Sequence, residues 1–235
     1  MTAELLDRRV LGGIRFVDGV TGLPIQRMLA VSAPNVRWIR NRSGDYVVAG
    51  APGLEAHVAA FAAAPGAPPP GTLNMTLTVS DPLGEYLPRR ATMELPRDPD
   101  PTHGDQPGSL FRPVAVALYP APIARTAPGW AVLRVSAPGR PGALLKVVED
   151  DTDHVLARGQ TDARGEALVA VPGIPVTTFN TGTGPVLATE VAANVQLIAA
   201  EDGAKLSDPD ELEHGDISNS APVQLASGRS LSLSL

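Results

Sequence analysis

The sequence predicts an all-β protein with two antiparallel β-sandwich domains, on the basis of three observations. The 235 residues include 23 Gly and 24 Pro, which leaves little room for long helices. Short apolar runs of alternating polarity recur between these residues, as is typical of strands joined by turns. A pattern in the first half also returns in the second, which indicates two copies of one domain.

The expected strands of the first half begin with the alternating run 14–18, which breaks at a Gly-rich turn and starts again at 23–25. Further alternating runs predict strands at 29–32, 36–39, 45–49, 73–79 and 86–95. An Ala-rich stretch and a stiff Pro-rich loop lie between the runs 45–49 and 73–79. We assign the first sandwich to residues 8–96.

A Pro- and Asp-rich segment without apolar periodicity, residues 97–113, is expected to be the linker. The short apolar strand that follows, 114–119, fits either domain, and we place it in a second sandwich, 114–235. Other strands expected there are 130–135, 144–149, 154–159, 167–171, 186–200 and 230–235, with a polar loop at 201–220. The last of them alternates Ser and Leu strictly and is expected to be an edge strand.

The internal repeat aligns two hairpin turns and the strands after them. The segment 40–48 matches 161–169 with Gly44 and Gly165 in register, and Pro52-Gly53 then matches Pro172-Gly173. These segments and the turn Asp18-Gly19-Val20-Thr21-Gly22 resemble the carboxypeptidase regulatory-like family, a transthyretin-like, immunoglobulin-like sandwich. The resemblance implies a scaffold or adhesive module without catalytic residues. The first copy departs from the pattern at Asn41 and Ser43, and the second lacks the opening turn.

Composition excludes several classes of function. The net charge is -6. Nothing in the sequence resembles the positively charged surface with which proteins bind the phosphates of nucleic acid. No run approaches the roughly 20 apolar residues that span a bilayer, and residues 1–13 lack the apolar region of a secretory signal. We therefore expect cytoplasmic synthesis without a signal peptide, no membrane insertion, and a fold without cysteine that depends on packing alone.

The sequence gives no sign of catalysis. The four histidines are scattered along the sequence. The sequence contains no Gly-x-Ser-x-Gly nucleophile elbow, no phosphate-binding loop, no dinucleotide-binding fingerprint and no His-Glu-x-x-His zinc-binding motif. Asp98, Asp100 and Asp105 are spaced closely enough to raise the question of calcium, but a solvated linker has the same composition. We predict that the protein is not an enzyme and needs no cofactor or metal.

The candidate interaction residues are aromatic, basic and edge-strand side chains: Arg37, Trp38, Arg40, Phe111, Tyr119, Leu231, Leu233 and Leu235. Trp38, between two arginines, fits either a core or a sugar-stacking platform, whereas Trp130 is expected in the core. The Ser-Leu tail either pairs with another chain through its free edge or completes its own sheet.

Our leading hypothesis is a structural or adaptor subunit that contacts other subunits of an assembly. The layout around 112–130 is also similar to accessory proteins of phage-tail-like contractile injection particles. The alternatives are a carbohydrate or cell-surface recognition module and an enzyme of unrecognised type.

Overall fold

The computed structural model describes residues 9–59, 66–175, 190–199 and 206–235. These residues form strands with one short helix and one 3-10 turn, so the all-β prediction is confirmed. The chain divides into two compact units, and each recruits segments from both halves of the sequence. Unit 1 is Met1–Val17, Leu23–Val79 and Ala91–Ala117, and unit 2 is Asp18–Gly22, Ser80–Arg90 and Leu118–Leu235.

The first seven strands form two sheets. Their order is β3-β4-β1-β7 in one sheet and β2-β5-β6 in the other. The strands are β1 Gly12–Asp18, β2 Ala30–Ser32, β3 Arg37–Arg40, β4 Tyr46–Gly50, β5 Leu73–Ser80, β6 Arg89–Leu95 and β7 Val114–Leu118, with helix α1 Glu55–Ala59 after β4 and the 3-10 turn η1 Pro101–His103 before β7.

The second seven strands also form two sheets, β10-β9-β12-β13 and β11-β8-β14. The strands are β8 Ala131–Ser136, β9 Leu144–Glu149, β10 Val155–Gln160, β11 Glu166–Val171, β12 Val191–Ile198, β13 Asn219–Leu225 and β14 Ser230–Ser234. The segment 186–200, expected to form one long strand or a strand pair, contains β12 in its described part, and residues 186–189 and 200 lie outside the described residues.

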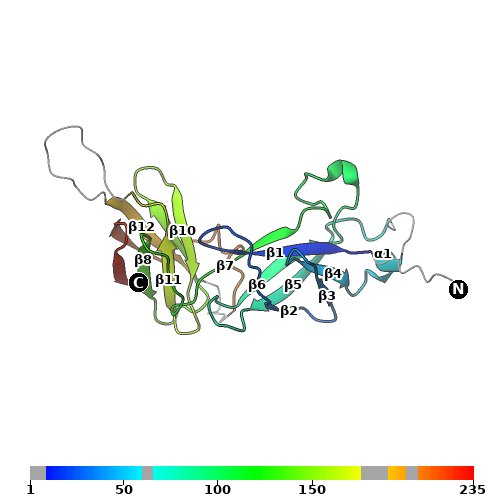
Figure 1. Ribbon diagram of the computed structural model, residues 1–235, viewed down its shortest axis with the longest axis horizontal. Helices are drawn as coiled ribbons and strands as arrows, with labels where there is room; N and C mark the ends of the chain where they lie inside the picture. The colour runs from blue at the N-terminus through cyan, green and yellow to red at the C-terminus, as the bar shows by residue number, and fades with distance from the viewer. Residues whose placement is uncertain (1–8, 60–65, 176–189, 200–205) are drawn as a thin grey trace. The chain divides into compact units, whose positions relative to one another are not determined.

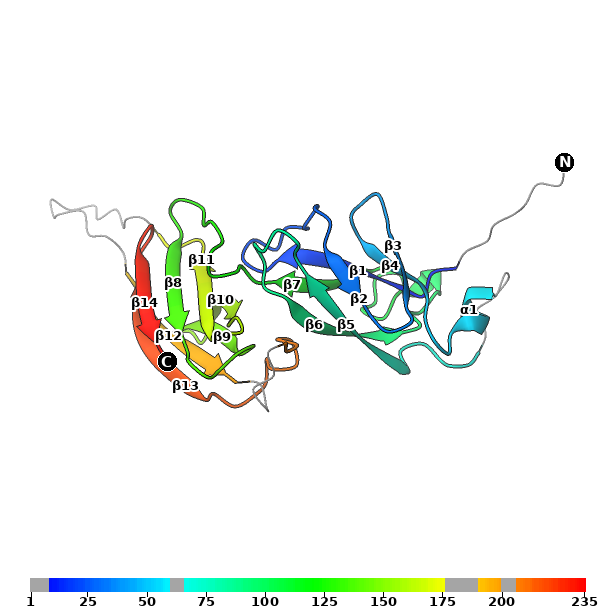
Figure 2. The same cartoon turned by 90° about the horizontal axis from the view of Figure 1, so that it is seen from below.

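When the strands of the two sets are matched in chain order, from β1 with β8 to β7 with β14, matched strands have largely the same neighbours in their sheets (Figures 1 and 2). The order β4-β1-β7 corresponds to β11-β8-β14, and β2-β5-β6 corresponds to β9-β12-β13. One strand differs among the described residues, because β3 pairs with β4 whereas β10 pairs with β9. The topology therefore extends the repeat from two turns to whole sets of strands.

The hairpin turns of the repeat have the same hydrogen bonds. Asp45 N donates to the Asn41 side-chain oxygen at 2.8 Å, and Glu166 N donates to Asp162 Oδ1 at 2.9 Å. The glycine before each donor, Gly44 or Gly165, has a φ of +88° or +83°. This is the left-handed region that side chains with a Cβ rarely adopt, so the shared glycine is a conformational requirement of the turn.

The core of unit 2 lies between its two sheets. Leu133 and Val135 of β8 point into the same cluster as Leu145 of β9 and Val195 of β12. The alternate residue Val132 belongs to a second cluster with Leu168 and Ala170 on the other face of β8. Since side chains alternate across a strand, this assignment makes unit 2 a β-sandwich.

Trp130 does not lie in the sandwich core, where the sequence placed it. It is half-buried and packs with Val20 against the smaller cluster of Val132, Leu168 and Ala170. The prediction was wrong because Trp130 comes just before β8, and the turn containing Val20 is distant in sequence.

In unit 1, β1 packs directly against the opposite sheet. A Cβ at Gly12 would lie 2.9 Å from Met93 Cε and 3.0 Å from Leu95 Cδ2, both side chains of β6. Ile14 and Phe16 follow Gly12 at alternate positions and are buried. Glycine at this position therefore allows the two sheets to approach closely.

The segment expected as a linker, 97–113, belongs to unit 1. Arg97 N donates to Leu11 O at 2.8 Å, Asp98 N to Gly108 O at 3.0 Å and Leu110 N to Asp98 O at 2.8 Å. The next strand, β7, joins the sheet of β1 and not a sheet of the second set. The Pro-rich composition did not reveal that this loop is folded onto unit 1, because the three hydrogen bonds above join residues ten or more positions apart.

No helix in the described part of the chain is long and apolar enough to cross a membrane.

Candidate protein-docking edge

Strand β14 lies at the end of the β11-β8-β14 sheet, parallel to β8, and among the described residues no strand pairs with its other side (Figure 2). Leu231, Leu233 and Leu235 pack against the core of unit 2. Ser232 and Ser234 are exposed on the outer face. The tail therefore completes its own sheet with its leucines and still leaves one edge open.

The correction to the sequence prediction concerns the three leucines. They were candidates for contact with a partner, but their side chains face inward, and Leu231 and Leu233 lie opposite Leu133 and Val135 of β8. A partner would instead meet the outer serines and the backbone edge.

The direction of the backbone groups follows from two hydrogen bonds. Leu235 N donates to Ser136 O at 2.9 Å, and Val132 N donates to Arg229 O at 2.9 Å. Odd-numbered residues of this segment therefore direct their N–H and C=O toward β8. Because successive backbone groups point to opposite sides of a strand, those of Ser232 and Ser234 point toward the open edge.

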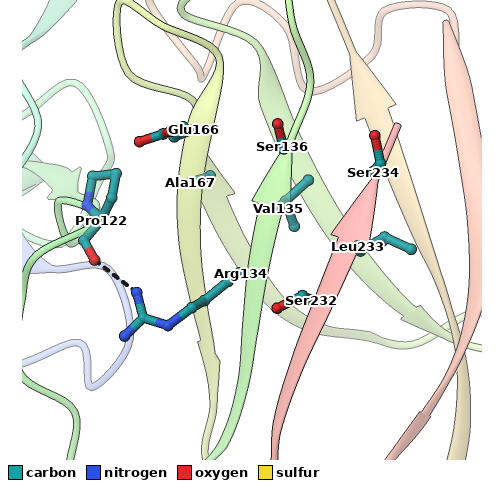
Figure 3. A pocket seen from close by; sticks show the side chains of 9 residues that line it. All are labelled: Pro122, Arg134, Val135, Ser136, Glu166, Ala167, Ser232, Leu233 and Ser234. Carbon is teal, nitrogen blue, oxygen red and sulfur yellow. Dashed lines mark hydrogen bonds between the residues drawn. The ribbon is translucent and has the colours of Figure 1, made fainter.

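The outer face beside this edge is hollowed into a shallow groove of about 530 Å³. Figure 3 shows Arg134, Ser136, Ser232, Ser234 and Glu166 projecting from β8, β14 and β11 on this face. Pro122 closes one side, and its carbonyl accepts a hydrogen bond from Arg134 Nη1 at 3.0 Å. Hydroxyl groups thus dominate the part of the groove nearest the open edge.

The carboxylate of Glu166 in the groove forms an ion pair with a neighbouring arginine. Glu166 accepts from Arg164 Nη2 at 2.8 Å, and Arg164 also contacts Asp162 in the repeat turn at 3.4 Å. These pairs are exposed, so each adds little stability. The groove offers hydrogen bonds and one anchored cation, and its lining contains no His or Cys that would activate a nucleophile.

The basic residues beside Trp38 are engaged within unit 1. Arg37 Nη2 donates to Ala49 O at 2.8 Å, and the Arg40 guanidinium lies 5.9 Å from the centre of the Tyr46 ring and donates to Gln26 O at 2.5 Å. Trp38 is half-buried, and its Nε1 has no hydrogen-bond partner among the described residues. Trp38 is therefore neither fully buried nor fully exposed, and both arginines beside it form hydrogen bonds within unit 1.

The two aromatic candidates near the expected linker differ in exposure. Phe111 is 58% exposed, whereas Tyr119 is 3% exposed. Burial raises the pKa of the Tyr119 hydroxyl to about 12. Tyr119 is therefore a packing residue of unit 2, where its ring would lie 2.8 Å from a Cβ placed at Gly19, and its assignment as a surface contact is corrected.

Sequence reasoning missed a partly buried charge network in unit 2, in which Arg89 and Asp208 are buried and Asp210 is exposed. The fully buried Arg89 guanidinium donates from Nη2 to Asp208 at 2.5 Å and to Asp210 at 2.6 Å. Burial raises the pKa of Asp208, and the charge of Arg89 opposes that shift. Asp208 and Asp210 are 119 and 121 residues away from Arg89 in the sequence, so no local pattern could have indicated this network.

In the acidic loop of unit 1, the carboxylates of Asp98 and Asp100 accept hydrogen bonds from the loop itself. Asp98 accepts from Asp100 N at 2.9 Å and contacts His103 Nδ1 at 2.7 Å, and Asp100 accepts from Thr102 N at 2.8 Å. These contacts cap the turn η1. No group of three His, Cys, Asp or Glu side chains in the described ranges could hold a metal ion.

Comparison with known proteins gives no relative: no family model, curated protein or solved structure matches the chain.

Proposed function

We propose that this protein is a non-catalytic structural or adaptor subunit that binds other protein subunits of an assembly by accepting a strand at the open edge of β14. The observation that supports the proposal is the outward direction of the Ser232 and Ser234 backbone groups. An added strand gains affinity from such main-chain hydrogen bonds, and side-chain contacts beside it provide specificity. The groove with Arg134 and the serines lies where those contacts would form.

We also propose that both sets of seven strands are immunoglobulin-like, transthyretin-like sandwiches. The shared strand order and the matching turns at Gly44 and Gly165 support two copies of one module. Such modules serve as rigid frames that present loops and edges, which fits a structural role.

The test replaces Ser232 with Pro. Proline removes the outward N–H and is tolerated at an edge position whose N–H takes no part in the ladder, so the fold should persist while strand addition is blocked. The matched control is Ser232→Ala, which keeps the N–H and removes only the hydroxyl. We expect the S232P chain, and not S232A, to lose copurification with the native assembly while both keep the circular dichroism of the wild type.

The assembly itself is tested by gentle isolation of the native protein from its source. Sedimentation far above the 24.4 kDa of the chain, at fixed stoichiometry with other subunits, is the expected result. A phage-tail-like contractile particle is the first assembly to examine, given the likeness noted in the sequence. A free monomer, or S232P and S232A that copurify equally well, would reject strand docking at β14.

A further inference from the structure

Strand β13, at the end of the other sheet of unit 2, has a protected edge. Its Pro222 lies opposite Asn194 of β12. Asp150 N donates to Ala192 O at 3.1 Å, so the even-numbered residues of β12, Asn194 included, direct their backbone groups toward β9. Asn194 and Pro222 therefore form a non-hydrogen-bonded pair, and the proline nitrogen, which carries no hydrogen, faces the open side of β13. Proline at this position hinders the addition of another strand.

The edge of β14 lacks such protection. Residues 230–235 include no proline, glycine or charged side chain. Strand β10, at the opposite end of the sheet that contains β13, has a register shift between Val155 and Ala157, which is another way to protect an edge. Of these three edge strands, β14 is the one with a regular and uncharged open side.

The sequence of β14 reads the same in both directions. Ser230–Ser234 is Ser-Leu-Ser-Leu-Ser. When two copies run antiparallel with their Ser232 residues opposite each other, every serine lies opposite a serine and every leucine opposite a leucine. A shift by one residue would place serine opposite leucine and turn the bonding groups away from each other. The strand is thus complementary to itself, as a two-fold symmetric interface requires.

The backbone of β14 can form a complete ladder in this register. The backbone groups of Ser232 and Ser234 point toward the open edge, and those of Ser230 do so by the same alternation. Ser230 of each copy would pair with Ser234 of the other, and Ser232 with its own counterpart. Because each such pair exchanges both N–H···O bonds, the two strands would form about six hydrogen bonds.

The side chains fit the same arrangement. Opposite residues of an antiparallel pair lie on one face, so Leu231 would contact Leu233 of the second copy on the inner face. Both leucines are half-buried in a single chain, and the second copy would cover part of their remaining surface. The serine hydroxyls would meet on the outer face. No charged residue lies in either strand, so pairing brings no like charges opposite each other.

We propose that two copies of this chain pair antiparallel through β14, about a two-fold axis at Ser232, and join their β11-β8-β14 sheets into one continuous sheet. The inference rests on the proposed strand addition at β14 and names a second copy as the partner. One pair of five-residue strands is a small interface, since stable complexes bury roughly 1,200–2,000 Å². The dimer should therefore be weak and reversible, with a dissociation constant on the order of 10 μM.

The first experiment is sedimentation equilibrium of the purified full-length chain from about 1 to about 200 μM. We expect a monomer–dimer equilibrium that persists in about 0.5 M sodium chloride, because the paired strands are uncharged. Ser232→Pro removes the central N–H of both copies and should weaken dimerisation about tenfold or more. The matched control, Gln224→Pro, changes an outward position of β13 and should have no effect. A monomer at every concentration, or equal behaviour of S232P and Q224P, would overturn the proposal.

A second experiment tests the register and does not depend on a proline variant. The chain contains no cysteine, so each variant carries a single thiol. Opposite residues of a hydrogen-bonded pair have Cα atoms about 5.5 Å apart, within reach of a disulfide. Ser232→Cys should therefore form a covalent dimer in a glutathione buffer. Ser234→Cys alone should not, because the two thiols are offset by about 13 Å along the strands, whereas a mixture of S230C and S234C should cross-link. Equal cross-linking of S232C and S234C would reject this pairing.

The outcomes also separate this inference from strand docking in general. A purified chain that stays monomeric, while S232P still fails to copurify with the native assembly, would reject the second copy as partner and retain docking of a different subunit. Normal copurification of S232P together with a monomeric purified chain would reject both.

Discussion

At the scale of residues, the pairing of Arg15 with Asp45 shows how a tertiary contact lowers the pKa of one side chain. Arg15 Nε and Nη2 donate to the two carboxylate oxygens of Asp45 at 2.7 and 3.1 Å. The hydrogen-bonded Arg15 guanidinium lowers the pKa of Asp45, and a hydrogen bond from Asn41 contributes in the same direction. The carboxylate that follows the first repeat turn thus also links β4 to β1.

This pairing makes stability depend on pH in a defined direction. A lowered folded-state pKa contributes stability above the unfolded value of about 4, and the contribution is lost as the pH falls through the folded-state pKa. We expect Asp45→Asn to cost about 1–2 kcal/mol at pH 7 and progressively less toward pH 2, measured by urea unfolding. In an Arg15→Met background the same substitution should cost little, because the partner is gone. A cost that is equal at both pH values would contradict the pairing.

At the scale of elements, the two repeat turns are equivalent in hydrogen bonding and different in their surroundings. A Cβ on Gly44 would meet Gln26 Oε1 at 3.1 Å, the end of a flexible side chain. A Cβ on Gly165 would lie 2.0 Å from the backbone oxygen of Ala137. The same turn therefore has a flexible neighbour in one unit and rigid backbone in the other.

This difference predicts unequal effects of one substitution. Gly44→Ala should cost about 1–2 kcal/mol for the positive φ, whereas Gly165→Ala should exceed about 3 kcal/mol because backbone must also move. The control pair is Gly53→Ala and Gly173→Ala, whose φ values of +79° and +80° are similar and whose Cβ positions meet nothing within 4 Å. Each of these should cost about 1 kcal/mol in urea unfolding. If Gly44→Ala and Gly165→Ala cost the same, the contact with Ala137 does not constrain the turn.

At the scale of the whole molecule, the compact units do not follow a single cut in the sequence. Unit 2 takes residues 18–22 and 80–90 from the first half of the chain, and Leu87 N and Arg90 N donate to Tyr119 O and Ser207 O at 2.9 and 2.8 Å. Strand β7 in turn completes the sheet of β1.

Fragments test this organisation. A chain of residues 1–119 keeps β7 beside β1 and should unfold cooperatively in urea, whereas residues 1–113 lack that strand and should lose cooperative unfolding. Residues 114–235 alone lack Arg89, so Asp208 loses its buried partner and the fragment should be less stable than unit 2 in the full chain. Similar stability for the two N-terminal fragments would show that β7 adds nothing to the first sheet.

The sequence by itself determined the all-β class, most strand positions and the repeat, because period-two alternation and glycines at positive φ are local requirements. The turns at Gly44 and Gly165 could be found for this reason. It also identified the Ser-Leu tail as an edge strand, since alternation places one residue type on each face.

Only the tertiary structure decided which strands share a sheet, where the charges lie and which edge stays open. Arg89 meets Asp208, the Pro-rich segment folds onto unit 1, and the tail turns its leucines inward. These outcomes depend on contacts between residues distant in sequence, where burial, charge pairing and register are set by the opposing surface. Composition and periodicity describe one segment at a time and carry no information about that surface.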